Sequence, residues 1–217
     1  HLFSSAASDV YKRQELTIDL PTNLTAWTGV DALTHALEAY IVPSLNPLCD
    51  GAALEALKLI SNWLEIAFDD PKNVHARGGM LIGSCFAGVA FTKGLGLVHS
   101  ISHMIGAEFN TQHGLTNAII LPAVMKFNLP TVKEKLPSIS SAMSLNGSSP
   151  DLIIQEIERK LQYVSIPRSL SDIGIPLECK RRIAEKAMLD SATGTNPRTT
   201  TVEEMEELTE IAISGAR

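Results

Sequence analysis

The chain has 217 residues, enough for one large domain or two small ones with a sizeable buried core. Hydrophobic residues make up 45% of it and charged residues 19%, with a formal net charge of −6. No stretch collects Lys or Arg and no apolar run reaches the length of a membrane span, so nucleic-acid and membrane binding are not expected. Three scattered cysteines, Cys49, Cys85 and Cys179, form no CxxC pair, which argues against a disulfide framework and favours a cytoplasmic protein.

The N-terminal segment differs from the rest of the sequence. Residues 1–14 read HLFSSAASDVYKRQ, with no initiator Met, no signal-peptide pattern and no periodicity that continues past residue 14. We expect a non-native or disordered segment there, the alternative being a genuine flexible terminus, and one all-helical domain over residues 15–217.

Apolar residues at helical spacing succeed one another along the chain, and strand signals are nearly absent after residue 20. Asn46 and Pro47 read as an N-cap and a proline at the first helical position, and Pro122 is a candidate kink. The pattern predicts a mainly α domain of roughly eight to ten helices. The helices are expected over residues 26–41, 46–69, 70–91, 94–109, 115–127, 132–143, 150–163, 177–189 and 202–213.

The third of these helices is rich in small residues. Gly78, Gly79, Gly83 and Gly88 would let another helix approach closely. Its most apolar part, residues 80–90, is expected to be a tightly packed core helix.

Five side chains are candidate metal ligands. Asp31 and His35 are four positions apart, which places them on one face of a helix, one turn apart. His99 and His103 repeat that spacing, and His113 comes shortly after. Most single-metal sites use three or four protein ligands when a position stays open for substrate, so one of the five is expected outside the site. Spacing alone does not say which one.

The residue types limit the metal. Imidazole nitrogens with one carboxylate and no thiolate suit Fe(II), Zn(II), Mn(II) or Co(II), and argue against a cysteine-rich zinc site or a calcium cage. Such an ion would act as a Lewis acid on an alcohol or carbonyl oxygen.

A D-x-x-x-H pair also arises by chance, and isolated histidines are more often structural. We interpret His75 as solvated, and Glu38, although it could support the site from one turn past His35, as a solvent-facing helix residue.

Three motifs carry a family resemblance. They are GVDALTHALEAY at 29–40, GLGLVHSISHMIGAEFNTQHGLTNAIILPAVMKFN at 94–128 and TNPR at 195–198. From about residue 16 to about residue 212 the sequence resembles the C-terminal metal-binding helical domain of the iron-containing alcohol dehydrogenase family. The resemblance implies the multi-helix C-terminal domain of that dehydroquinate synthase-like fold.

The same resemblance assigns roles to the five candidates. It implies that Asp31, His35, His99 and His113 bind the metal, Fe(II) first and Zn(II) as the alternative, and that His103 is a catalytic proton relay or substrate contact. The implied activity is NAD(P)-dependent: the metal lowers the pKa of a small alcohol or diol, and hydride passes to NAD(P), or back to an aldehyde. A homo-oligomer is implied for the full-length protein. We attach no role to Asp190, near the TNPR turn.

The α/β dinucleotide-binding domain of the family is not in this sequence. There is no Gly-Gly-Gly-Ser run and no strand–glycine loop–helix unit, and we assign Gly94 and Gly96 to helix packing. We therefore expect a fragment of a longer protein, inactive by itself, whose cofactor-binding residues stay unassigned. Two other hypotheses are a relative that reduces another carbonyl or works without metal, and a non-catalytic helical bundle with a structural metal or none. Four intact ligands argue against the metal-free enzyme.

Overall fold

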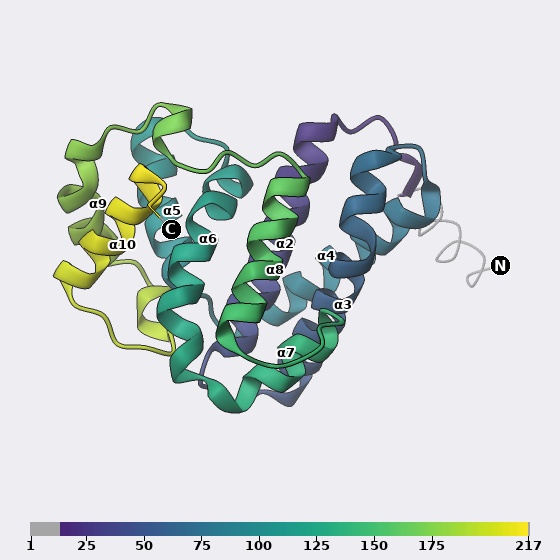
Figure 1. The fold of residues 1–217 in the computed structure, drawn as a ribbon, viewed down its shortest axis with the longest axis horizontal. Helices are drawn as coiled ribbons and strands as arrows, with labels where there is room; N and C mark the ends of the chain where they lie inside the picture. The colour runs from purple at the N-terminus through teal and green to yellow at the C-terminus, as the bar shows by residue number, and fades with distance from the viewer. Residues whose placement is uncertain (1–13, 217) are drawn as a thin grey trace.

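The computed structural model describes residues 14–216, and every regular element within that range is helical (Figure 1). The predicted mainly α fold is thus confirmed for this part of the chain. The expectation for residues 1–14 falls outside the described residues, apart from Gln14. The nine α-helices there are α2 (Thr22–Ile41), α3 (Pro47–Asp69), α4 (Val74–Ala90), α5 (Leu97–Phe109), α6 (His113–Asn128), α7 (Leu136–Ala142), α8 (Pro150–Tyr163), α9 (Lys180–Ala187) and α10 (Val202–Ser214). Short 3₁₀ helices cover Phe91–Lys93, Leu129–Thr131, Lys133–Lys135, Ser171–Ile173, Leu177–Cys179 and Thr193–Thr195.

Helix α2 is the centre of the fold. It packs against α3 and α4 on one side and against α6 on the other, and α5, α9 and α10 lie beyond α6 (Figure 1). Thirteen of its 20 residues are buried, so it is a core helix rather than a surface helix with one apolar face. It begins at Thr22, four residues earlier than predicted, directly after Pro21, whose missing N–H costs nothing at a helix start.

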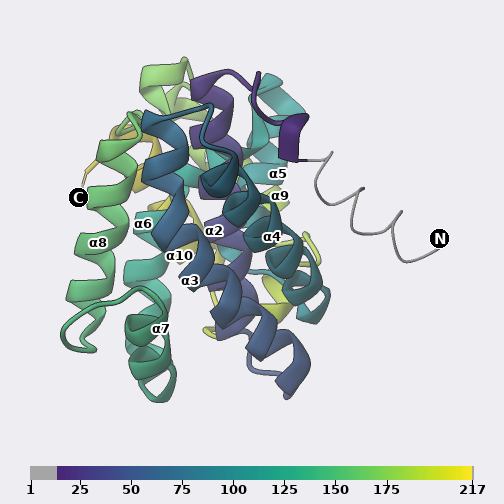
Figure 2. The same cartoon turned by 90° about the vertical axis from the view of Figure 1, so that its right-hand side faces the viewer.

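Helix α4 corrects two predictions. It begins at Val74 rather than at Asp70, because the Asn73 side chain accepts a hydrogen bond from the Ala76 N–H and caps it. It packs on α3 at Gly79 and Gly83, as predicted, and Figure 2 shows the two helices side by side in front of α2. Gly78 instead faces Gln14, and Gly88 has open space around it. The outer face is not core: Ile82 and Phe86 are 42% and 38% exposed. The stretch Val74–Lys93 is also long and apolar enough to cross a membrane by length and composition, a test that core helices pass too.

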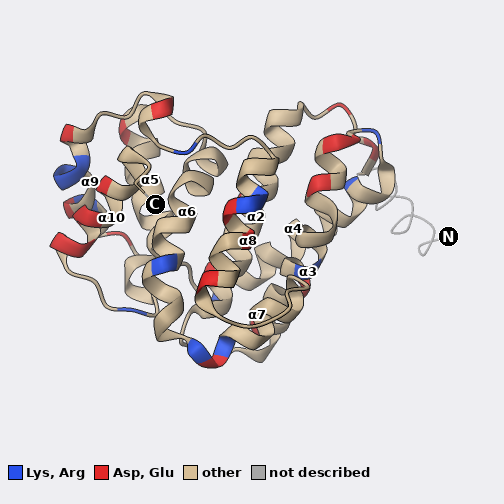
Figure 3. Cartoon of the chain, viewed as in Figure 1, with Lys and Arg blue, Asp and Glu red and all other residues tan. Residues whose placement is uncertain are grey.

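The remaining helices differ from prediction mainly at their ends. Helix α6 begins at His113, two residues early, because the Gln112 side chain accepts a hydrogen bond from Leu115 N–H. Helices α7 and α9 are shorter than expected, since 3₁₀ turns replace their first residues. Helix α9 carries mostly Lys and Arg, whereas the charged residues of α10 are all Glu (Figure 3). Arg181 of α9 pairs with Glu206 of α10, and Arg182 pairs with Glu108 of α5.

Candidate metal centre

Four of the five candidate side chains form one cluster where α2, α5 and α6 meet. Asp31 and His35 come from α2, His99 from α5 and His113 from α6, and one ligand atom from each lies within 4.8 Å of all the others. Nε2 of His35 is 3.0 Å from Nε2 of His99, and Nε2 of His113 is 3.8 Å from Oδ1 of Asp31.

A glycine that sequence reasoning missed allows this convergence. A Cβ atom at Gly114, in the first turn of α6, would lie 2.5 Å from the carbonyl oxygen of Trp27 in α2. Only a residue without a side chain lets the start of α6 approach α2 so closely. The approach places His113 beside Asp31.

His103 lies next to the cluster and not in it. Its ring stacks on that of His113, with centroids 5.6 Å apart and an interplanar angle of 14°. Its Nδ1 is 3.0 Å from Oδ2 of Asp190, a residue for which the sequence predicts no role. The side chain of His103 is 41% exposed, whereas that of Asp190 is 13% exposed.

Glu38 is buried, and the prediction that it faces solvent is wrong. One carboxylate oxygen, Oε2, lies 2.6 Å from Nδ1 of His99, and the other accepts a hydrogen bond of 2.8 Å from the Val98 N–H. The assignment of Gly96 to helix packing needs the same correction. A Cβ atom at Gly96 would lie 2.7 Å from Oδ1 of Asn196 and 2.8 Å from Oε1 of Glu38, so this glycine makes room for both polar groups at the start of α5.

The bond to Glu38 decides which nitrogen of His99 carries the proton. An ionised carboxylate only accepts hydrogen bonds, so Nδ1 of His99 donates. In the neutral imidazole the lone pair is then on Nε2, the atom that faces His35. A carboxylate that fixes a ligand histidine in this way is typical of metal sites.

The electrostatics keep the other two imidazoles neutral. Burial lowers the pKa of His35 and of His113, and the nearby carboxylate of Asp31 opposes this shift in both. Neutral imidazole is the form that binds a cation. The four side chains offer three imidazole nitrogens and one carboxylate oxygen, a donor set that fits a divalent first-row metal such as Fe(II) or Zn(II).

The cluster is buried at one end and open at the other. The side chain of His99 is 1% exposed and that of His113 is 43% exposed. A group bound among the four would thus contact the buried ring of His99 at its inner side and be accessible to solvent beside His113.

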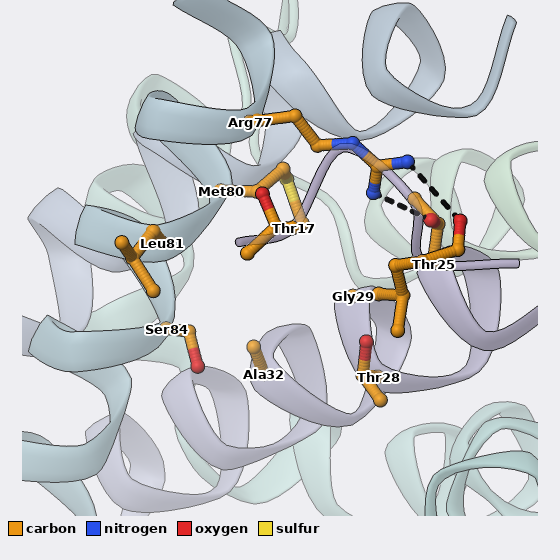
Figure 4. A pocket seen from close by; sticks show the side chains of 10 residues that line it. Thr17, Thr25, Thr28, Gly29, Ala32, Arg77, Met80, Leu81 and Ser84 are labelled. Carbon is orange, nitrogen blue, oxygen red and sulfur yellow. Dashed lines mark hydrogen bonds between the residues drawn. The ribbon is translucent and has the colours of Figure 1, made fainter. Parts of the chain in front are cut away.

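A separate cavity of about 140 Å³ lies between α2 and α4 (Figure 4). Buried Arg77 stands at one end of it and donates hydrogen bonds to Thr25 Oγ1 at 2.6 Å and to the carbonyls of Pro71 and Leu20. None of the five candidate ligands lines this cavity.

Fold and cluster together define an all-helical domain that gathers three histidines and one aspartate from three helices. Residues 25–213 match the profile described as the Fe-containing alcohol dehydrogenase family, C-terminal. The chain belongs to this family, which confirms the resemblance carried by the three motifs.

Individual relatives agree with this. The chain is 35% identical over 206 residues to the NAD-dependent methanol dehydrogenase of Bacillus methanolicus, covering 92% of this chain and 54% of that protein. It is 38% identical over 213 residues to the NADPH-dependent butanol dehydrogenase of Clostridium saccharobutylicum, covering 93% of this chain and 54% of the relative. A crystal structure of 1,3-propanediol oxidoreductase superposes with a TM-score of 0.89 at 37% identity, over 92% of this chain and 54% of that one. The chain therefore spans about half the length of the relatives it matches.

Proposed function

We propose that this chain is the metal-binding helical part of an NAD(P)-dependent alcohol dehydrogenase that acts on small alcohols, diols or aldehydes. The observation that carries the proposal is the cluster of Asp31, His35, His99 and His113, with Glu38 fixing the proton on Nδ1 of His99. Relatives named as methanol, butanol and 1,3-propanediol dehydrogenases support the substrate class.

Within this proposal the four clustered side chains hold one divalent ion, Fe(II) in the first place. Such an ion would supply Lewis acidity to the substrate oxygen and lower the pKa of the alcohol. NAD(P) would take up or supply the hydride. The residues of this chain provide the neutral donors, the fixed His99 ring, and an opening beside His113 through which a substrate oxygen can approach.

His103 is the residue we assign to proton transfer. With Asp190 accepting from Nδ1, the Nε2 atom of His103 is left for exchange with the substrate oxygen or with solvent. Its stacking on His113 places it beside the cluster without a place in the ligand set.

The exposure of His113 favours a catalytic site over a closed structural one. Structural zinc sites are four-coordinate and closed, whereas catalytic sites keep a position open. Here one candidate ligand is 43% exposed while another is 1% exposed.

Metal analysis tests the ligand assignment. We expect about one Fe(II) or Zn(II) per chain in anaerobically purified protein, lost in His99→Ala and His113→Ala and kept in His103→Ala. His75→Ala, at an exposed position on α4, is the matched control. Equal metal loss in His103→Ala would show that the ligand set is wrong.

A second measurement separates the catalytic from the structural site. The protein loaded with Co(II) should change its visible absorption when an azole is added, because the azole takes the open position. An unchanged spectrum would favour a closed structural metal and contradict the proposed function.

A further inference from the structure

Asn117 lies at the middle of the cluster, one turn after His113 on α6. Its side chain is fully buried. Nδ2 of Asn117 is 2.7 Å from Oδ1 of Asp31, 3.0 Å from Nε2 of His113 and 3.1 Å from Nε2 of His99. A single amide nitrogen thus contacts three of the four candidate ligands.

The chemistry of these neighbours fixes which end of the amide faces the cluster. A carboxylate oxygen only accepts hydrogen bonds, so the NH₂ group, and not the carbonyl oxygen, must face Asp31. Nε2 of His99 carries a lone pair because Glu38 accepts from Nδ1 of the same ring. The positive end of the amide dipole therefore faces acceptor atoms of three of the four candidate ligands, as a cation bound among them would.

The other end of the same amide is unpaired. Oδ1 of Asn117 is buried and has no hydrogen-bond partner among residues 14–216. Buried amide oxygens in purely structural positions normally have one. Within the described part of the chain, the hydrogen bonds of this amide all go to the cluster, so no bond on its oxygen side opposes a rotation away from the imidazoles.

We propose that Asn117 takes the place of the metal when the site is empty and competes with the metal for the site. A nitrogen lone pair that binds an ion cannot accept a hydrogen bond at the same time, so the contacts from Asn117 to His99 and His113 exist only in the metal-free protein. The bond to Asp31 can persist, because a carboxylate offers further lone pairs. The amide keeps the empty cluster assembled at the cost of weaker metal binding.

The proposal rests on the metal site of the proposed function. It predicts that removing the Asn117 amide strengthens metal binding, whereas removing an ordinary supporting residue weakens it. Asn117→Leu has a similar shape but no hydrogen-bonding group. It should lower the melting temperature of the metal-free protein by about 5 °C, from the loss of one or two buried hydrogen bonds. The zinc-loaded protein should lose less, and Zn(II) should bind about 5-fold to 10-fold more tightly.

Zn(II) titration against a chelator, with melting curves of both forms, measures these effects on the 217-residue chain. Asn117→Ala, which admits water to the cluster, should show a smaller change of the same sign and serves if Asn117→Leu does not fold. The control is Thr116→Val, next to Asn117 on α6. It removes a buried hydroxyl that hydrogen-bonds to the carbonyl oxygen of Gln112 and to Oγ1 of Thr111. It should lower both melting temperatures equally and leave the Zn(II) affinity unchanged.

The outcomes separate the two proposals. Zn(II) binding that is unchanged or weaker in the Asn117 variants, with one ion still bound by the wild type, overturns the competition and leaves the metal site standing. A wild-type protein that binds no ion overturns the metal site itself, and with it the role of Asn117.

Discussion

The carboxylate of Glu38 offers the sharpest test of how the site is built. Glu38→Gln keeps the size of the side chain and removes its charge. The two oxygens now accept from Val98 N–H and from Nδ1 of His99, at 2.8 and 2.6 Å. Gln has one acceptor oxygen, so either the backbone N–H or the imidazole N–H must face an NH₂ group instead.

The size of the effect depends on what differs between the two metal states. The carboxylate bond to His99 exists in both, but a bound ion draws electron density from the ring and strengthens the Nδ1–H···O bond. Replacing such a partner of a ligand histidine costs about 10-fold to 100-fold in metal affinity, or about 1.4–2.8 kcal/mol. We expect Glu38→Gln to fall within that range for Zn(II).

The assay is chelator competition, with circular dichroism to show that the variant is folded. Glu55→Gln makes the same chemical change at an exposed position of α3 that pairs with Lys58, and should leave Zn(II) affinity as in the wild type. A folded Glu38→Gln protein that binds Zn(II) within about 2-fold of the wild type would refute the role of Glu38 in holding His99.

Three further predictions concern other parts of the structure. Gly96→Ala should lower the free energy of unfolding by about 1–3 kcal/mol, because its Cβ would meet Asn196 and Glu38, and the displaced Glu38 should weaken Zn(II) binding. Urea titration measures the stability, and Gly88→Ala, with open space around it, should not destabilise. Asp190→Asn should keep its metal in elemental analysis, since the carboxylate contacts His103; metal loss would contradict the placement of His103 outside the ligand set. Hydrogen bonds from Arg182 and Lys186 lower the pKa of Glu108 from 4.5 to about 2, so its stabilisation is complete above pH 4.5 and lost as the pH falls through about 2. Glu108→Gln should therefore lower the free energy of unfolding at pH 7 by at most about 1 kcal/mol in urea titrations, and a difference as large at pH 2 as at pH 7 would contradict the ion pair.

Helices whose ends depend on local signals were predictable from the sequence. Helix α8 begins and ends at the predicted residues, Pro150 and Tyr163, because Ser149 caps it and Pro150 fits its first position. The exposure of the outward face of α4 was not predictable, because an apolar side chain such as Phe86 reads the same in the sequence whether it is buried or exposed. Which face of α4 is buried depends on where α3 packs.

The candidate site was likewise predictable only where its residues are close together in the sequence. Asp31 and His35 form a local pair at helical spacing, and their role as ligands, with His99 and His113, stays a prediction that the metal analysis tests. The partner of Glu38 is 61 positions away in another helix, so spacing alone could not show that this carboxylate turns inward. Asn117 did carry a signal, four positions after His113 on the same helix, and an amide there matches the spacing of the ligand pairs.

The cluster joins three helices that are far apart along the chain, between residues 31 and 113, whereas α8, α9 and α10 contribute none of the four side chains. An ion held there would act as a cross-link that closes one long loop, and such links restrict the unfolded chain in the way a disulfide does. Metal supply would then govern how strongly this part of the chain resists unfolding, separately from anything the ion contributes to chemistry.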